Sequence, residues 1–164
     1  MGRSKRSRRS ATVSAFTGVG PALAFGAMTM TGVIAPVEAY AADVNVTTNT
    51  NRVDLDTKSG TTVDIAAGVT IKNDAPSSTI GTVQATTQTW TLTNNGKIDG
   101  RQDDPFLTND GVKFTKGGTI NNTATGSITG FYGVFTAGSS STVSNSGSIT
   151  GTIRGVEMQA GGSF

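Results

Sequence analysis

Acidic side chains are the candidate catalytic groups of this 164-residue chain, because its sequence contains neither histidine nor cysteine. An acid–base reaction would therefore depend on paired carboxylates, as in enzymes that cleave glycosidic bonds. Asp103 and Asp104 are adjacent, but they lie in a turn-like stretch where solvated acidic pairs are common. The candidate carboxylates are Asp99, Asp103, Asp104, Asp110 and Glu157. We expect no catalytic residue among them and interpret the chain as a non-enzyme.

Glycine pairs are the second motif that could bind a ligand. The calcium-binding nonapeptide of β-roll proteins reads Gly-Gly-x-Gly-x-Asp. Gly117-Gly118 and Gly161-Gly162 lack the Gly and Asp that should follow. Other Gly-x-Gly pairs have the character of turn glycines and not of phosphate-binding loops. We therefore expect no metal and no cofactor.

The first 41 residues have the parts of a secretory signal peptide. Residues 1–10 are strongly basic, and the region from about residue 11 to Pro36 is apolar. Ala39-Tyr40-Ala41 is a small-x-small site, which predicts cleavage before Ala42. Glycine and proline inside the apolar region make it a poor transmembrane helix. We predict a cleaved signal peptide over residues 1–41. Arg8-Arg9 is compatible with twin-arginine export, but the residues that follow lack the apolar pair of such signals, so the general secretory route is favoured.

The positive net charge of the chain belongs to this leader. Five of the 13 Lys and Arg residues lie in the first nine positions. After residue 41 there remain eight basic and ten acidic residues, a net charge of −2. The mature chain has no basic patch, so we expect no nucleic-acid partner.

Three short apolar motifs recur in the same order with a period near 22 residues. Each alternates apolar and polar residues, which is the period of a β-strand. Three strands per period predict one coil of a parallel β-helix, in which equivalent residues of successive coils stack inside. The stacked core is expected to contain Val112, Phe114, Ile120, Ile128, Val134, Val143, Ile149 and Val156.

The repeats predict an all-β solenoid of about four coils over residues 61–164, with 42–60 as an N-terminal cap or lead-in. Upstream, Val69-Thr70-Ile71 lies about one period before Leu92 and is assigned, with Val63-Asp64-Ile65, to an earlier coil. About residues 101–108 are an insertion, and Pro105 within it predicts a protruding loop because proline cannot join an internal ladder.

Asparagine and aromatic residues also have predicted places in these coils. Asn94, Asn121 and Asn145 hold equivalent positions, where stacked amides can form ladders. Trp90 and Phe131-Tyr132 could contact a sugar or a protein. The simpler interpretation places Trp90 at the cap end of the fold and Phe131-Tyr132 at a corner of a coil.

The strings TLTNNGKIDG, GGTINNTATGSITG and TVSNSGSITG resemble the passenger repeats of bacterial autotransporters, from about Gly60 onward. This resemblance implies a right-handed parallel β-helix at the cell surface, exported through a C-terminal outer-membrane β-barrel translocator. The chain contains no sequence for such a barrel, and Phe164 falls in the middle of a coil. We therefore expect an N-terminal fragment of a passenger.

The predicted function is that of an exported structural or interaction protein with an adhesin role. It would reach the cell surface, the outer membrane or the medium through a periplasmic intermediate. Expected partners are the β-barrel translocator, a host surface, or other copies of the chain, because the last coil exposes a strand edge. The alternatives are a fragment of a β-helix enzyme acting on carbohydrate, and a nonfunctional truncated product.

Overall fold

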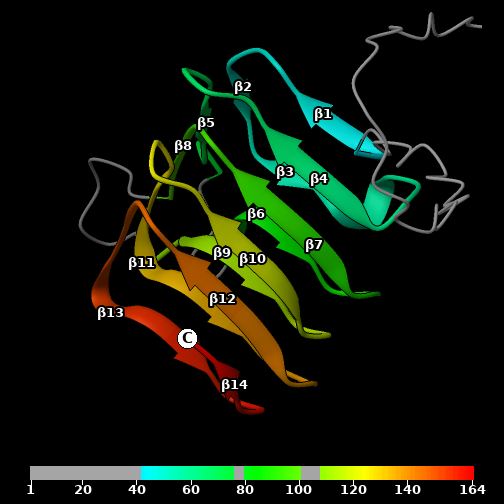
Figure 1. Cartoon of the computed structure of the whole chain (residues 1–164), viewed down its shortest axis with the longest axis vertical. Helices are drawn as coiled ribbons and strands as arrows, with labels where there is room; N and C mark the ends of the chain where they lie inside the picture. The colour runs from blue at the N-terminus through cyan, green and yellow to red at the C-terminus, as the bar shows by residue number, and fades with distance from the viewer. Residues whose placement is uncertain (1–41, 76–79, 101–107) are drawn as a thin grey trace, which may run out of the picture. The chain divides into compact units, whose positions relative to one another are not determined.

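The computed structural model describes residues 42–75, 80–100 and 108–164, and these are mostly β-strand (Figure 1). Within these ranges the only helical element is one 3-10 turn, η1 (Leu55–Thr57), and no helix is long and apolar enough to cross a membrane. Every strand pairing is parallel. The prediction of an all-β chain with parallel strands is confirmed. The predicted signal peptide and most of the predicted loop lie outside the described residues.

The strands form two sheets. Sheet A contains, in spatial order, β1 (Val44–Val46), β4 (Thr62–Ile65), β7 (Trp90–Asn94), β10 (Gly118–Asn122), β12 (Ser141–Asn145) and β14 (Gly162–Ser163). Sheet B contains, in spatial order, β2 (Thr50–Asn51), β5 (Thr70–Lys72), β8 (Lys97–Asp99), β11 (Ser127–Thr136), β9 (Asp110–Phe114), β6 (Gly81–Ala85) and β3 (Val53–Asp54), and β13 (Ser148–Met158) pairs with β11.

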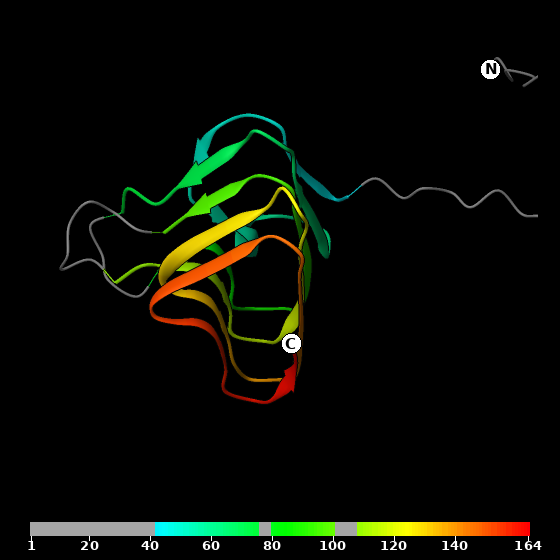
Figure 2. The ribbon, with the colours of Figure 1, turned by 60° about the vertical axis from the view of Figure 1, so that its left-hand side comes forward.

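Sheet B has two arms. The first arm contains β2, β5 and β8, and the second contains β9, β6 and β3; β11 and β13 run through both arms. The first half of β11 pairs with β8 and its second half pairs with β9. The chain therefore runs through sheet A, the first arm and the second arm, and then returns to sheet A. We call each such passage a layer, and in Figure 2 each layer follows the path of the one before it around a common interior. The first to fifth layers are residues 44–54, 62–85, 90–114, 118–136 and 141–158, and β14 begins a sixth.

Apolar residues line the interior in columns, because equivalent residues of successive layers face one another. In sheet A, Leu92 lies opposite Ile120, which lies opposite Val143. Ile98, Ile128 and Ile149 form a column in the first arm, and Val112, Val134 and Val156 form one in the second. Phe114 lies between Ala85 and Thr136. Ile149 and Val156, in the fifth layer, are only half-buried, and the other repeat residues are buried.

The register differs from the sequence alignment at two places. Asn122, and not Asn121, lies opposite Asn94 and Asn145. Side chains alternate across a strand, so the inward residue after Ile120 has to be two positions later. In the second layer Val63 lies opposite Leu92, and Ile71 lies opposite Ile98 instead of preceding Leu92 in its column.

Asn94, Asn122 and Asn145 form an amide ladder beside the turn from sheet A into the first arm. The Asn94 Nδ2 group donates to Asn122 Oδ1 at 2.8 Å, and Asn122 Nδ2 donates to Asn145 Oδ1 at 2.8 Å. Asn122 Nδ2 also lies 3.2 Å from the Gly126 carbonyl and 3.1 Å from the Ser148 carbonyl. These bonds satisfy polar groups that are buried at the turn.

Carboxylates tie the first layer to the layers that follow. The Asp43 carboxylate accepts hydrogen bonds from the backbone N–H groups of Thr61 and Thr62, at 2.6 and 3.0 Å. Asp56 accepts from the backbone N–H and the hydroxyl of both Thr86 and Thr87, at 2.5 to 3.0 Å. The segment expected to be a cap or lead-in thus contributes β1, β2 and β3, and its side chains bond to the next layer.

Candidate interaction surface

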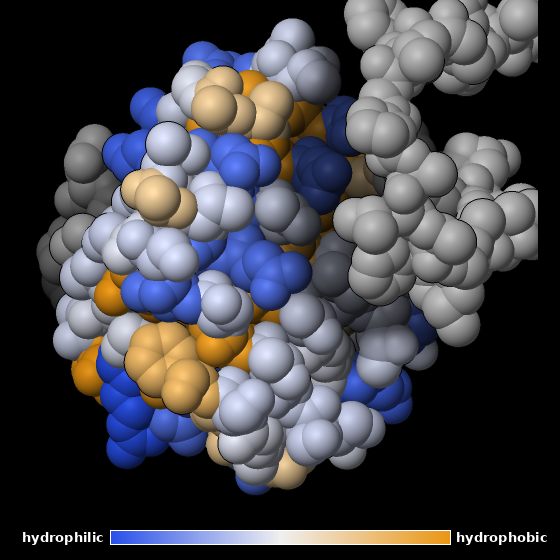
Figure 3. All heavy atoms as spheres, viewed as in Figure 1, coloured by the Kyte–Doolittle hydropathy of each residue, from blue (hydrophilic) through white to orange (hydrophobic). Residues whose placement is uncertain are grey.

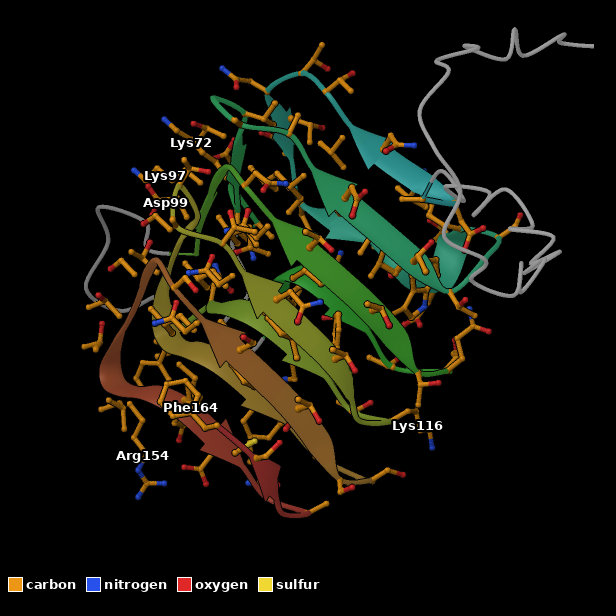
Figure 4. All side chains as sticks on the ribbon, in the orientation of Figure 1. Lys72, Lys97, Asp99, Lys116, Arg154 and Phe164 are labelled. Atoms are coloured by element: carbon orange, nitrogen blue, oxygen red, sulfur yellow. The ribbon has the colours of Figure 1, made fainter. Side chains whose placement is uncertain are left out.

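The described candidate carboxylates, Asp99, Asp110 and Glu157, form no group that could hold a metal ion. In the described ranges no group of three or more acidic residues could hold a metal ion. Asp99 faces outward opposite Thr129, accepts from its hydroxyl at 3.0 Å and pairs with Lys97 at 2.7 Å (Figure 4). Asp103 and Asp104 lie outside the described residues.

Trp90 is excluded from contact with a partner because it is 1% exposed. It lies in β7, in the third layer, and not at the cap end of the fold. Gly118 lies opposite it, and a Cβ atom there would come within 2.4 Å of the Trp90 carbonyl and 3.0 Å of the Phe114 ring. The absence of a side chain at Gly118 leaves room for the Trp90 backbone and the Phe114 ring.

Three aromatic rings of β11 meet where the two arms of sheet B join. The rings of Phe131 and Tyr132 make an edge-to-face contact with centroids 5.2 Å apart. The rings of Tyr132 and Phe135 are 5.6 Å apart and tilted by 42°. The ammonium of Lys113 lies 5.6 Å from the centre of the Phe135 ring, within the range of a cation–π contact. All three rings are half-buried, so part of each remains exposed.

Charged residues of the neighbouring strands surround these rings. The register places Phe135 between Lys113 and Glu157, and Tyr132 opposite Arg154. Arg154 bonds to the Glu157 carboxylate. We call this set the corner cluster: Asp110, Lys113, Phe131, Tyr132, Phe135, Arg154 and Glu157.

Asp110 is the buried member of the corner cluster, with 4% exposure. The Tyr132 backbone N–H donates to its carboxylate at 3.3 Å, and Lys113 Nζ lies 3.9 Å away. Burial raises the pKa of Asp110 above its ordinary value, and these two neighbours oppose the rise without cancelling it. The Asp110 carboxylate is therefore largely withdrawn from solvent.

A bend in β11 produces the corner, and glycine permits the bend. The pairing of β11 with β13 shifts between Gly130 and Tyr132, as at a β-bulge. A Cβ atom at Gly130 would lie 2.2 Å from the backbone nitrogen of Gly111. Only a residue without a side chain allows this close approach, which brings Phe131 and Tyr132 to the outside of the corner.

The sequence predicted Phe131-Tyr132 at a corner and named Glu157 only as a candidate carboxylate, and it did not indicate Phe135 or Lys113 as surface residues of this site. The signal was present, because Lys113, Phe135 and Glu157 each follow the valine of a Gly-Val motif. Each therefore takes the same outward position in successive layers. Ala39 and Ala41 lie outside the described residues, and Ala42 is the first residue described.

The corner cluster has the composition of a contact surface. Aromatic rings and arginine are enriched where proteins bind partners. No protein-family model matches this chain, and no curated protein or solved structure gives a significant match.

Proposed function

We propose that this chain is the exported N-terminal part of a bacterial autotransporter passenger, and that its described residues form a right-handed parallel β-helix. The observation that supports this best is the register, in which each sheet A strand from β4 through β7 and β10 to β12 lies parallel to the next. One repeat of this length cannot bury its own apolar residues. Successive repeats are therefore expected to stack their short strands and to share a thin core. The leader ending at Ala41 supports export.

In this proposal the chain crosses the inner membrane, passes through the periplasm and reaches the cell surface or the medium through an outer-membrane β-barrel translocator. It acts there as a structural and interaction protein with an adhesin role, and it performs no catalysis. The corner cluster makes the contact with a host surface, because its rings and guanidinium group offer apolar area and directed hydrogen bonds in one place.

Export is tested by expressing the chain in a bacterium and sequencing the amino terminus of the periplasmic product by mass spectrometry. We expect the product to begin at Ala42. Ala41→Arg should retain the leader, because the peptidase pocket requires a small side chain. The matched control, Tyr40→Arg, changes the tolerant middle position and should still be processed. An unprocessed or cytoplasmic parent chain would contradict export.

The contact surface is tested by binding of the purified chain to cultured epithelial cells, measured by flow cytometry. Replacing both Tyr132 and Phe135 with Ala should weaken binding by about tenfold or more, as expected for central aromatic contacts. The control is Thr119→Ala, an outward residue of sheet A. Equal loss in both variants would contradict the assignment to the corner cluster, and no binding by the parent chain would contradict the adhesin role.

A further inference from the structure

The charged side chains of the corner cluster form ion pairs with one another. Arg154 bonds to the Glu157 carboxylate, and Lys113 Nζ lies 3.9 Å from the Asp110 carboxylate. The formal charges of the cluster therefore sum to zero. Because binding surfaces carry charge complementary to that of their partners, a cluster without net charge suits a partner without net charge.

The three rings of the cluster offer apolar area in small pieces. The planes of Phe131 and Tyr132 are nearly perpendicular, with an angle of 83° between them, and Phe135 is tilted by 42° from Tyr132. The half-buried rings therefore do not form one flat face. Stable protein partners bury about 800 Å² on each side, mostly as a continuous patch. A single exposed ring instead suits a ligand that is itself about the size of one ring.

The polar atoms beside the rings include hydrogen-bond donors and acceptors. Among the described residues, Arg154 and Glu157 share one bond, from Nη1 to Oε2, so further guanidinium N–H groups and the second carboxylate oxygen can bond to a ligand. Glu157 and, to a smaller extent, the Tyr132 phenol raise the pKa of Arg154, which indicates that both groups lie near the guanidinium. A sugar hydroxyl both donates and accepts, and it therefore requires this mixture of groups.

The cluster lies on the outer face of sheet B. Lys113, Phe135 and Glu157 occupy one register position in successive strands, next to valines that face the core. Side chains alternate across a strand, so these three point outward. Figure 4 shows Arg154 projecting from β13, and in Figure 3 hydrophobic and strongly hydrophilic atoms lie side by side at the surface there. A strand pairing with the edge of β13 would leave the outer face of β9 and β11 uncovered.

We propose that the corner cluster binds a neutral pyranose sugar of a surface glycan. This inference rests on the proposed adhesin role and names the ligand class of the same surface. The apolar C–H face of the sugar stacks on an exposed ring, and hydroxyls at the rim of the sugar bond to Arg154, Glu157 and the Tyr132 phenol. β-Galactosides suit this arrangement, because adjacent C–H groups project together from one face of the galactose ring.

Saturation-transfer NMR of the full chain, recovered from an exporting bacterium, tests the ligand class. The probes are the methyl glycosides of galactose, glucose and mannose, and we expect transfer to the galactoside, strongest at its C–H groups. Tyr132→Ala should remove most of the transfer, and Tyr132→Phe, which deletes only the hydroxyl, should reduce it several-fold. No transfer to any of the three glycosides would overturn the proposal.

Two controls accompany these variants. Thr119→Ala changes an outward residue of sheet A and should leave the transfer unchanged, and an equal loss there would contradict the assignment to the corner cluster. Circular dichroism should show the same β-rich spectrum for each variant as for the parent chain. A variant that loses this spectrum is replaced by Phe135→Leu, which removes a ring and keeps an apolar side chain.

The charge of the ligand is tested with lactose and sialyllactose, which differ by one acidic sugar. We expect the chain to bind lactose at least as tightly as sialyllactose. Binding of sialyllactose alone would show an anionic ligand and overturn the proposal.

Periodate treatment of epithelial cells distinguishes this inference from the adhesin role on which it rests. Mild periodate cleaves the vicinal diols of surface glycans, and we expect it to abolish binding of the chain, measured by flow cytometry. Equal binding to treated and untreated cells would overturn the sugar ligand and leave the adhesin role intact. No binding to untreated cells would contradict the adhesin role, and the glycoside measurements would still decide whether the cluster binds a sugar.

Discussion

One inward column of sheet A changes character along the stack. Its first two members, Val46 and Ile65, are apolar, and the next three are the amides Asn94, Asn122 and Asn145. The neighbouring column, which includes Ile120, is apolar throughout. The difference lies in the turns that follow: the later turns have buried carbonyl and N–H groups to which the amides bond. Turn chemistry, and not the sheet, therefore decides where a polar side chain is tolerated inside.

The largest effect is expected from moving an amide into the apolar column. Ile120→Asn removes a fully buried side chain and buries an amide away from the ladder, which should cost about 3–5 kcal/mol of unfolding free energy. Ile65→Asn makes the same chemical change opposite Asn94, where the ladder can take up the new amide, and should cost less. Urea unfolding measures both. Equal losses would show that the two columns do not differ.

The reverse exchange should have a smaller effect. Asn122→Leu leaves buried partners of the ladder unsatisfied and should lower the unfolding free energy by about 1–3 kcal/mol. The matched control is Asn121→Leu, which changes the adjacent outward residue and should stay within about 0.5 kcal/mol. If Asn121→Leu were the more damaging variant, the register described here would be wrong.

Asp56, like the amide ladder, stabilises a turn through side-chain hydrogen bonds, and its contribution to stability depends on pH. Burial raises its pKa, but hydrogen bonds from Thr86 and Thr87 lower it by more, so the folded pKa lies below the ordinary value. The stabilisation is therefore present above the unfolded pKa of about 3.9 and is lost as the pH falls through the folded value.

Asp56→Asn should remove this pH dependence. Discounted for solvent screening, the expected loss at neutral pH is about 1 kcal/mol. Urea unfolding at neutral pH and near pH 3 should show the gap between parent and variant closing in acid. A gap that stays constant with pH would mean that the charge of Asp56 contributes nothing.

The smallest effect is expected at Asp110, where the sign reverses. Its raised pKa means that the folded chain favours the protonated acid, so stability falls as the pH rises through the folded pKa. Asp110→Asn keeps an oxygen for the Tyr132 N–H and removes the buried charge. We expect equal or slightly higher stability at neutral pH, measured by thermal unfolding, and little change at low pH. A clear loss at neutral pH would show that Lys113 compensates the charge fully.

Much of the fold, but little of the candidate interaction surface, could be predicted from the sequence. Alternation and period predicted parallel stacked strands, because short apolar motifs such as the one at Ile128 recur at nearly constant spacing. The prediction that Asn121 belongs to the amide ladder was wrong. Asn121 and Asn122 are chemically identical, and only the alternation of side chains along the strand shows which of them faces inward. The partners of Asp56 could not be predicted, because no pattern relates an acid in one turn to hydroxyls 30 residues later.

The aromatic contacts were partly predictable. The pair Phe131-Tyr132 was visible as a corner, but its meeting with Phe135 depends on how far β11 bends at Gly130. A bend of that kind follows from close backbone approach between layers, which no single segment of sequence reveals. The local sequence pattern therefore predicts where Phe131 and Tyr132 lie, whereas their contact with Phe135 depends on tertiary packing.

The shift in pairing between β11 and β13 has a consequence for how this scaffold can be changed. Between Gly151 and Arg154 the fifth layer holds two residues where the fourth layer has only Phe131, and the columns on both sides remain in step. The surplus residue is accommodated where the two arms meet, with Ile153 displaced toward solvent. This junction is thus the natural point for grafting a foreign peptide, since length added there leaves the alignment of the stacked strands unchanged.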